Sequence, residues 1–302
     1  MTSHSELLRG QAASATPELR VVTHGHVPSD FITNLRQEVE DCYRTLSPPA
    51  LKPVELCLID TVEALSRFLA REKEELGVGT LGEEDFLALH DAWHGLPRIV
   101  VCVERMLTVE ASVRQGAIHH EVGHTVLHGS LAHYLFRLSP EVLAQTRQMG
   151  IETAVLQQVV YFVSIAVKDY VVTRLLVEHG LGESQVALAL YQFEVSPEDE
   201  LAWRLARTDL QAKLLYVAGQ LKPLLFAWPL LPLSSLSQPI SKRLEEMLAH
   251  LPAKERGRLL GLAEQIAGCL GQETGQNIAK ALNLLLLNHG NQERGVGEKR
   301  ND

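Results

Sequence analysis

The chain has few cysteines and no excess of positive charge. Its 302 residues contain 4 Cys, widely spaced and without a C-x-x-C pair. Cys57 and Cys102 lie in apolar, strand-like runs, so we expect them to be buried small hydrophobic residues and neither metal ligands nor disulfide partners. The formal net charge is −9, which leaves no basic stripe to neutralise phosphates and argues against nucleic-acid binding.

The chain also lacks an uninterrupted apolar run of membrane-spanning length. Residues 1–15 contain no apolar segment of the secretory-signal type. Residues 151–177 are numerous enough to span a bilayer, but several charged and amide side chains interrupt them. Residues 224–236 are fewer and are broken by Pro229 and Pro232. We therefore expect no transmembrane segment and a reducing, cytoplasmic setting.

The first third of the sequence alternates between strand and helix patterns. Asp60 and Glu63 have the spacing of a capping box for a helix to about residue 76. Ser29 is the expected N-cap of a helix to about residue 45. We expect a short helix and a loop around His90, Trp93 and His94. Strands are expected at residues 19–22, 54–59 and 98–104.

Beyond Gly129 the sequence is helical almost throughout. Ser139-Pro140 and Ser196-Pro197 are N-cap and N1 pairs followed by acids. We expect a long helix over 151–178 and later helices near 198–220, 239–250, 253–268 and 275–288. The predicted fold class is α+β, with a small mixed sheet and a mainly helical half. The predicted domains are 17–129 (α/β) and 130–288 (helical), between disordered segments 1–16 and 289–302.

The most informative motif is His120-Glu121-Val122-Gly123-His124, an H-E-x-x-H sequence in a helix expected over about 109–128, between Thr108 as N-cap and Gly129. Positions i and i+4 lie on one face of an α-helix, so both imidazoles can bind one tetrahedral Zn²⁺. Glu121 would lie beside that metal. It could act as the general base toward zinc-bound water, whose pKa falls to about 7.

This helix resembles the active-site helix of the zincin metallopeptidases. The resemblance covers residues 109–129 and, more loosely, the strands before them. The metzincin branch fits poorly because Leu127 and Ser130 stand where its longer motif has Gly and His. A gluzincin-like arrangement fits better and implies a third ligand from a later helix, a sheet backing the motif helix and a peptide or protein substrate. It also suggests residues 98–104 as a sheet edge for the substrate.

The third ligand is predicted to be Asp169, because it lies mid-helix, where an unpaired buried carboxylate would be costly. Its helix would have to approach the motif helix closely, and Gly123 offers the small surface for this. The other two candidates, Glu152 and Glu178, lie in the first and last turns of that helix, where charges are commonly solvated, and Glu178 is the next choice. His128 lies eight residues, or about 12 Å, beyond His120, so one ion cannot easily bind both.

Two features of the predicted centre stay open. In gluzincins an acid often supports the first motif histidine from one turn beyond the third ligand, where this chain has Thr173. The support is then weaker or comes from another residue. A donor for the transition-state oxyanion is also expected, and the sequence does not choose among Tyr161, Tyr170, His133 and His179.

The pattern favours a zinc-dependent metallohydrolase, in first place a peptidase. Its zinc ligands would be His120, His124 and Asp169, and Glu121 would be its catalytic residue. One alternative is a catalytically inactive zinc-binding scaffold with a regulatory role. Another is a helical interaction protein without metal, supported by the leucine-rich second half.

Overall fold

The computed structural model describes residues 16–49, 52–77, 85–193, 196–233 and 237–297. They fall into two compact units. The first runs up to Val109 and includes Thr125–Gly129. The second comprises Glu110–His124 and the residues from Ser130 onward. A mixed sheet with helices precedes a mainly helical half, so the predicted α+β class is confirmed.

The first unit is built on a four-stranded sheet in the order β1-β2-β4-β3. The parallel strands β1 (Leu19–His24), β2 (Val54–Ile59) and β4 (Arg98–Cys102) occur where the sequence predicted strands. The fourth, β3 (Ala88–Asp91), pairs antiparallel with β4. The prediction of a short helix and a loop around His90 is wrong there. A strand of four residues is too short to show a clear alternation of apolar and polar side chains. The strand β3 is therefore recognised only by its pairing with β4.

This pairing also corrects the prediction for residues 98–104. Because β4 lies between β2 and β3, it is not a sheet edge and cannot accept an added peptide strand. The strand ends at Cys102, and a short helix, α3 (Val103–Thr108), follows. Thr108 therefore ends α3 instead of capping the motif helix, which begins at Ala111.

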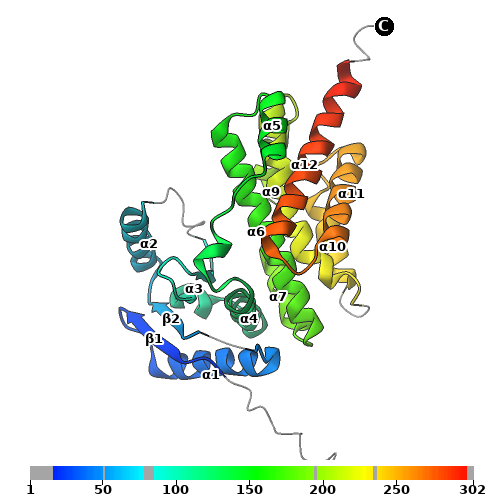
Figure 1. Ribbon diagram of the computed structural model, residues 1–302. Coiled ribbons are helices and arrows are strands. Elements are labelled where there is room, and N and C mark those ends of the chain that lie inside the picture. Colours follow the sequence, from blue (N-terminus) through cyan, green and yellow to red (C-terminus); the bar gives the residue numbers. More distant parts are fainter. Residues whose placement is uncertain (1–15, 50–51, 78–84, 194–195, 234–236, 298–302) are drawn as a thin grey trace, which may run out of the picture. The chain divides into compact units, whose positions relative to one another are not determined.

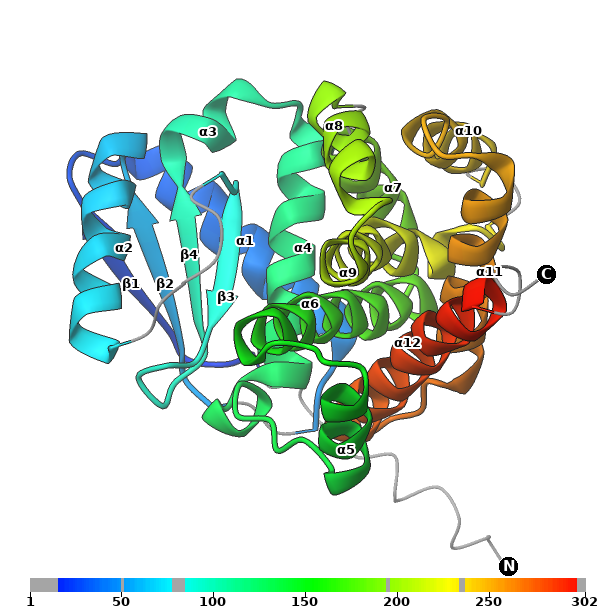
Figure 2. The ribbon, with the colours of Figure 1, turned by 90° about the horizontal axis from the view of Figure 1, so that it is seen from above.

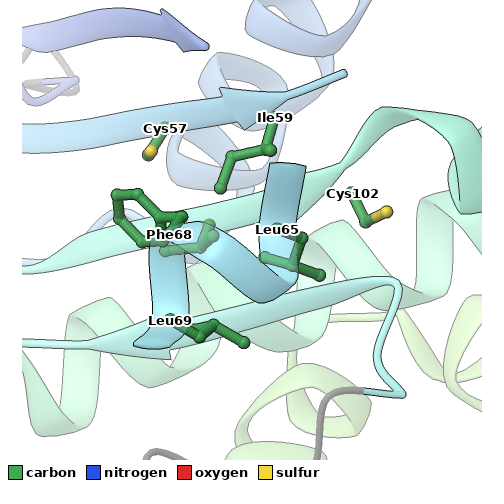
Figure 3. Packing of buried hydrophobic residues seen from close by; sticks show 7 residues of the cluster. Cys57, Ile59, Leu65, Phe68, Leu69 and Cys102 are labelled. Atoms are coloured by element: carbon green, nitrogen blue, oxygen red, sulfur yellow. The ribbon is translucent and has the colours of Figure 1, made fainter. Parts of the chain in front are cut away.

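Helices α1 (Ser29–Leu46) and α2 (Val62–Leu76) lie on opposite sides of the sheet (Figures 1 and 2). Side chains at helical spacing on α2, among them Leu65 and Phe68, pack on alternate residues of β2 and β4 (Figure 3). Cys57 and Cys102 belong to this core and are not in disulfides, as predicted. Each large apolar side chain buried here contributes about 1.5–3 kcal/mol.

The predicted capping box at Asp60 is wrong, because Thr61 caps α2 by accepting a hydrogen bond from the Ala64 N–H. The Asp60 carboxylate instead accepts one from the His26 N–H at 2.9 Å. Gly25, with φ +85°, sits so close that a Cβ would overlap this carboxylate. Asp60 thereby ties the ends of two strands together. Ser29 likewise starts α1 without a side-chain cap.

Besides α4, the second unit contains eight α-helices within the described residues. Ser139 and Ser196 cap α5 and α8 as predicted, accepting from the N–H groups of Val142 and Glu198. Helices α6 and α9 lie side by side (Figure 2). The bounds are α5 (Pro140–Gln148), α6 (Thr153–Glu178), α7 (Gly182–Gln192), α8 (Pro197–Ala206), α9 (Leu210–Ala227), α10 (Ser237–Met247), α11 (Ala253–Cys269) and α12 (Thr274–Gly297).

Three features of this unit differ from the sequence prediction. The helix expected over 198–220 is two helices, because the Asp209 side chain caps a new one by accepting from the Ala212 N–H at 2.7 Å. Helix α7 had not been predicted. Helix α12 continues to Gly297, past its expected end near 288 and into the segment expected to be disordered. The other segment expected to be disordered, residues 1–16, lies outside the described residues except for Thr16.

Among the described residues, no helix has both the length and the hydropathy that a membrane span requires. Helix α6, which contains most of residues 151–177, is one of the helices that do not meet these requirements. We had expected this from the charged side chains that interrupt the stretch.

Arg98 forms a buried ion cluster in the first unit. It donates to Asp91 from Nε at 3.1 Å and from Nη2 at 2.8 Å, and to Glu72 from Nη2 at 2.8 Å. His94 Nε2 lies 2.8 Å from the same Glu72 oxygen. Only 8% of the Arg98 side chain is exposed, so the guanidinium compensates two carboxylates away from water.

Arg98→Leu should lower the free energy of unfolding of the first unit by about 3–5 kcal/mol, because both carboxylates lose their buried counter-ion. Urea unfolding followed by circular dichroism measures this. Arg20→Leu is the control, since its pair with Glu18 is more than half exposed on both sides and contributes about 0–1 kcal/mol. A similar small loss in both variants would contradict the prediction.

Candidate metal centre

The centre is built where α6 crosses α4 (Ala111–His128) (Figure 2). Gly123 is the contact point, since a Cβ there would lie 2.8 Å from Val172 Cγ1. Real Cβ atoms do not come so close. The absence of a side chain therefore allows the helices to approach, as predicted, and brings residues of α6 opposite the two motif histidines.

Three donor atoms converge at this crossing. His120 Nε2 and His124 Nε2 lie 3.1 Å apart. Asp169 Oδ1 lies 3.6 Å from the first and 3.2 Å from the second. Bonds of about 2.0–2.2 Å to one tetrahedral ion would separate neighbouring ligand atoms by about 3.3–3.6 Å. The three separations are close to this range, so the donor set fits one small divalent cation.

The three side chains lie in the interior of the second unit. His120, Asp169 and His124 are 5%, 7% and 9% exposed. Asp169 does not pair with the cations near it in sequence, because Arg174 donates to the Leu270 and Gly271 carbonyls. The ammonium of Lys168 lies over the Tyr134 ring, 4.1 Å from its centroid. The Asp169 carboxylate is thus turned inward to the histidines.

His120, His124 and Asp169 change one another's pKa values. Burial disfavours the protonated form of His120, but the hydrogen bond and charge of Asp169 outweigh it and raise the pKa. Burial dominates at His124 and lowers its pKa to about 4. Burial would also raise the pKa of Asp169, yet the two histidines hold it well below its usual range. Without metal, the Asp169 carboxylate therefore stabilises the protonated form of His120.

The other candidates lie outside this group. Within the described residues, His120, His124 and Asp169 are the set of three whose donor atoms lie within 4.8 Å of one another. Glu152 and Glu178 are exposed. His128 is buried but does not join the set. His120, His124 and Asp169 all belong to the second unit.

The neighbours of His120 include two residues that sequence reasoning missed. Gln185 on α7 places its Oε1 3.2 Å from His120 Nδ1, and the Phe226 ring packs on the imidazole with centroids 5.1 Å apart. Gln185 does not ionise and lies on a helix that had not been predicted, so no sequence signal singled it out. Thr173, noted above as a departure from the gluzincin pattern, is fully buried, and its hydroxyl has no hydrogen-bond partner in the described structure.

Two of the four candidates for the oxyanion donor are engaged elsewhere. The Tyr170 hydroxyl donates to the Ala267 carbonyl at 3.3 Å, and His179 Nδ1 donates to the Leu175 carbonyl at 2.8 Å. Tyr161 and His133 stay candidates for this donor. Lys168, which the sequence did not single out for the site, is a further cation. Burial lowers the pKa of both His124 and His133, and the charge of Lys168 adds to this effect.

Comparisons of the chain with protein-family models, curated proteins and solved structures found no match. What the structure supports is a possible metal site formed by three residues. These residues are the H-x-x-x-H pair of α4 and one acid from α6.

Metal binding at this centre should depend on pH in a defined direction. His120 is protonated in the metal-free protein below its pKa, which lies above the ordinary 6.5, and the metal must displace that proton. Between about pH 5 and 6.5 the affinity for Zn²⁺ should therefore fall about tenfold for each unit by which the pH is lowered. Calorimetric titration in two buffers of different ionisation enthalpy should give about one proton released. An affinity independent of pH over this interval would contradict the assignment.

Proposed function

We propose that this protein is a zinc-dependent metallohydrolase of the H-E-x-x-H type that acts on peptide bonds. His120, His124 and Asp169 would hold the zinc, and Glu121 would be the general base. The observation that carries the proposal is the convergence of two imidazole nitrogens and one carboxylate oxygen at the separations of a tetrahedral site. Three protein ligands leave the fourth position of such a site open.

The donor set favours zinc over the harder cations. Two imidazoles and one carboxylate are ligands typical of catalytic zinc, whereas Mg²⁺ and Ca²⁺ take mainly oxygen ligands in larger number. The buried position of the ligands also excludes most competing water. When bound, zinc would lower the pKa of a water molecule to about 7 and polarise a substrate carbonyl.

Glu121 is suited to move protons at this centre. It follows His120 directly in α4, is partly exposed, and its charge contributes to the raised pKa of His120. Its carboxylate would accept the proton of the attacking water and return it to the leaving amine. Lys168 adds positive charge next to Asp169. This charge would help to stabilise the negative charge of the tetrahedral oxyanion.

Purified protein should contain about one Zn²⁺ per chain, and His124→Ala or Asp169→Ala should lose it, because each removes one of three ligands. Atomic absorption after dialysis against a weak chelator measures the content. His119→Ala is the matched control. It removes an equally buried histidine of α4 whose Nδ1 bonds Ser184 Oγ at 3.0 Å. Full zinc in both ligand variants would show that the site is wrongly assigned.

Glu121→Gln should retain zinc and reduce turnover of unfolded protein or peptide libraries by about 10²–10⁴-fold, because it removes the base and no ligand. Glu152→Gln, at an exposed position, is the control and should keep wild-type activity. Equal activity in Glu121→Gln would refute the role of Glu121. A zinc-loaded wild type without turnover on any substrate would favour the inactive scaffold.

A further inference from the structure

The Gln185 side chain bridges one turn of α4. Its Nε2 donates to the Gly116 carbonyl at 3.0 Å, and its Oε1 lies 3.2 Å from His120 Nδ1. Residues 116 and 120 are one turn apart on the same helix face. The amide is fully buried, at 0% exposure. Both ends of one rigid group are therefore held by the same helix, and the amide cannot turn without losing both bonds.

The orientation of this amide determines where the His120 proton lies. A carbonyl oxygen only accepts and an NH₂ group only donates. Since the NH₂ group is used on the Gly116 carbonyl, Oε1 faces the imidazole and Nδ1 must be the nitrogen that carries hydrogen. The lone pair of the neutral ring is then on Nε2, which faces His124 Nε2 and Asp169 Oδ1.

The packing of α7 on α4 makes this bridge possible. A Cβ at Gly116 would overlap the Ser184 carbonyl oxygen, so the two helix backbones touch at that point. The Ser184 hydroxyl donates to the Leu181 carbonyl at 2.9 Å and therefore accepts from His119 Nδ1. Adjacent residues of α7 thus hold adjacent histidines of α4, one of which belongs to the donor set and one of which does not.

We infer that Gln185 is a positioning residue for the metal, which fixes the tautomer and ring orientation of His120 through a neutral acceptor. This inference rests on the proposed metal site. A carboxylate in this place would fix the same tautomer and also raise the basicity of the ligand. The amide fixes the ring without adding a negative charge. More of the positive charge of a bound metal is then left to act on water and substrate.

The test compares Gln185→Leu, Gln185→Glu and Ser184→Ala by competition for Zn²⁺ with a chromophoric chelator. Gln185→Leu removes the acceptor and should weaken binding about 10–100-fold. Gln185→Glu keeps an acceptor for Nδ1 and should bind within about tenfold of wild type. Ser184→Ala removes the neighbouring α7–α4 bond and should leave zinc affinity unchanged within about twofold, even where it lowers the melting temperature.

Visible absorption of the Co²⁺-substituted proteins gives a second readout that stability alone does not move. Gln185→Leu should alter the ligand-field bands, and Ser184→Ala should not. Wild-type affinity in Gln185→Leu, or an equal loss in Ser184→Ala, would overturn the positioning role. If Gln185→Leu does not fold, Gln185→Glu decides, and a loss as large as that in His120→Ala overturns it. A wild type that binds no Zn²⁺ would instead refute the proposed function.

Discussion

Three electron-rich atoms face one another inside the second unit, and this is the constraint on which the centre depends. Two imidazole nitrogens and a carboxylate oxygen at 3.1–3.6 Å repel one another unless a positive charge lies between them. The raised pKa of His120 and the lowered pKa of Asp169 have this cause, because a proton on His120 supplies positive charge beside the Asp169 carboxylate. A divalent cation satisfies the same demand more completely, since it accepts all three lone pairs at once.

The surrounding packing serves this convergence. Two glycines of α4 let other helices approach its backbone: Gly123 admits Val172 of α6, and Gly116 admits Ser184 of α7. The first approach brings the Asp169 carboxylate to the histidines. The second brings the Gln185 amide to His120. A glycine within a helix costs about 0.5–1 kcal/mol of stability relative to alanine. Here this cost is offset by the helix contacts that only a residue without a side chain permits.

The features predictable from sequence were those encoded by local pattern. The apolar run of β2, the serine-proline caps of α5 and α8, and the i, i+4 histidines each depend on neighbouring residues. Asp169 could be singled out because a mid-helix acid needs a partner. In contrast, β3 is defined by its pairing with β4. The cap at Asp209 lies within a stretch whose helical pattern continues on both sides, so the sequence predicted one helix there. Gln185 comes from another helix, and an amide carries no signature of its role. Contacts between segments far apart in the sequence cannot be recognised from the periodicity of apolar residues.

The central claim is that His120, His124 and Asp169 hold one zinc ion, and X-ray absorption at the zinc edge of the purified protein tests it most directly. We predict that the zinc is surrounded by nitrogen and oxygen alone at about 2.0–2.2 Å, with the multiple-scattering signature of two imidazoles. A sulfur shell at about 2.3 Å, which would require one of the cysteines, or a protein without zinc would contradict it.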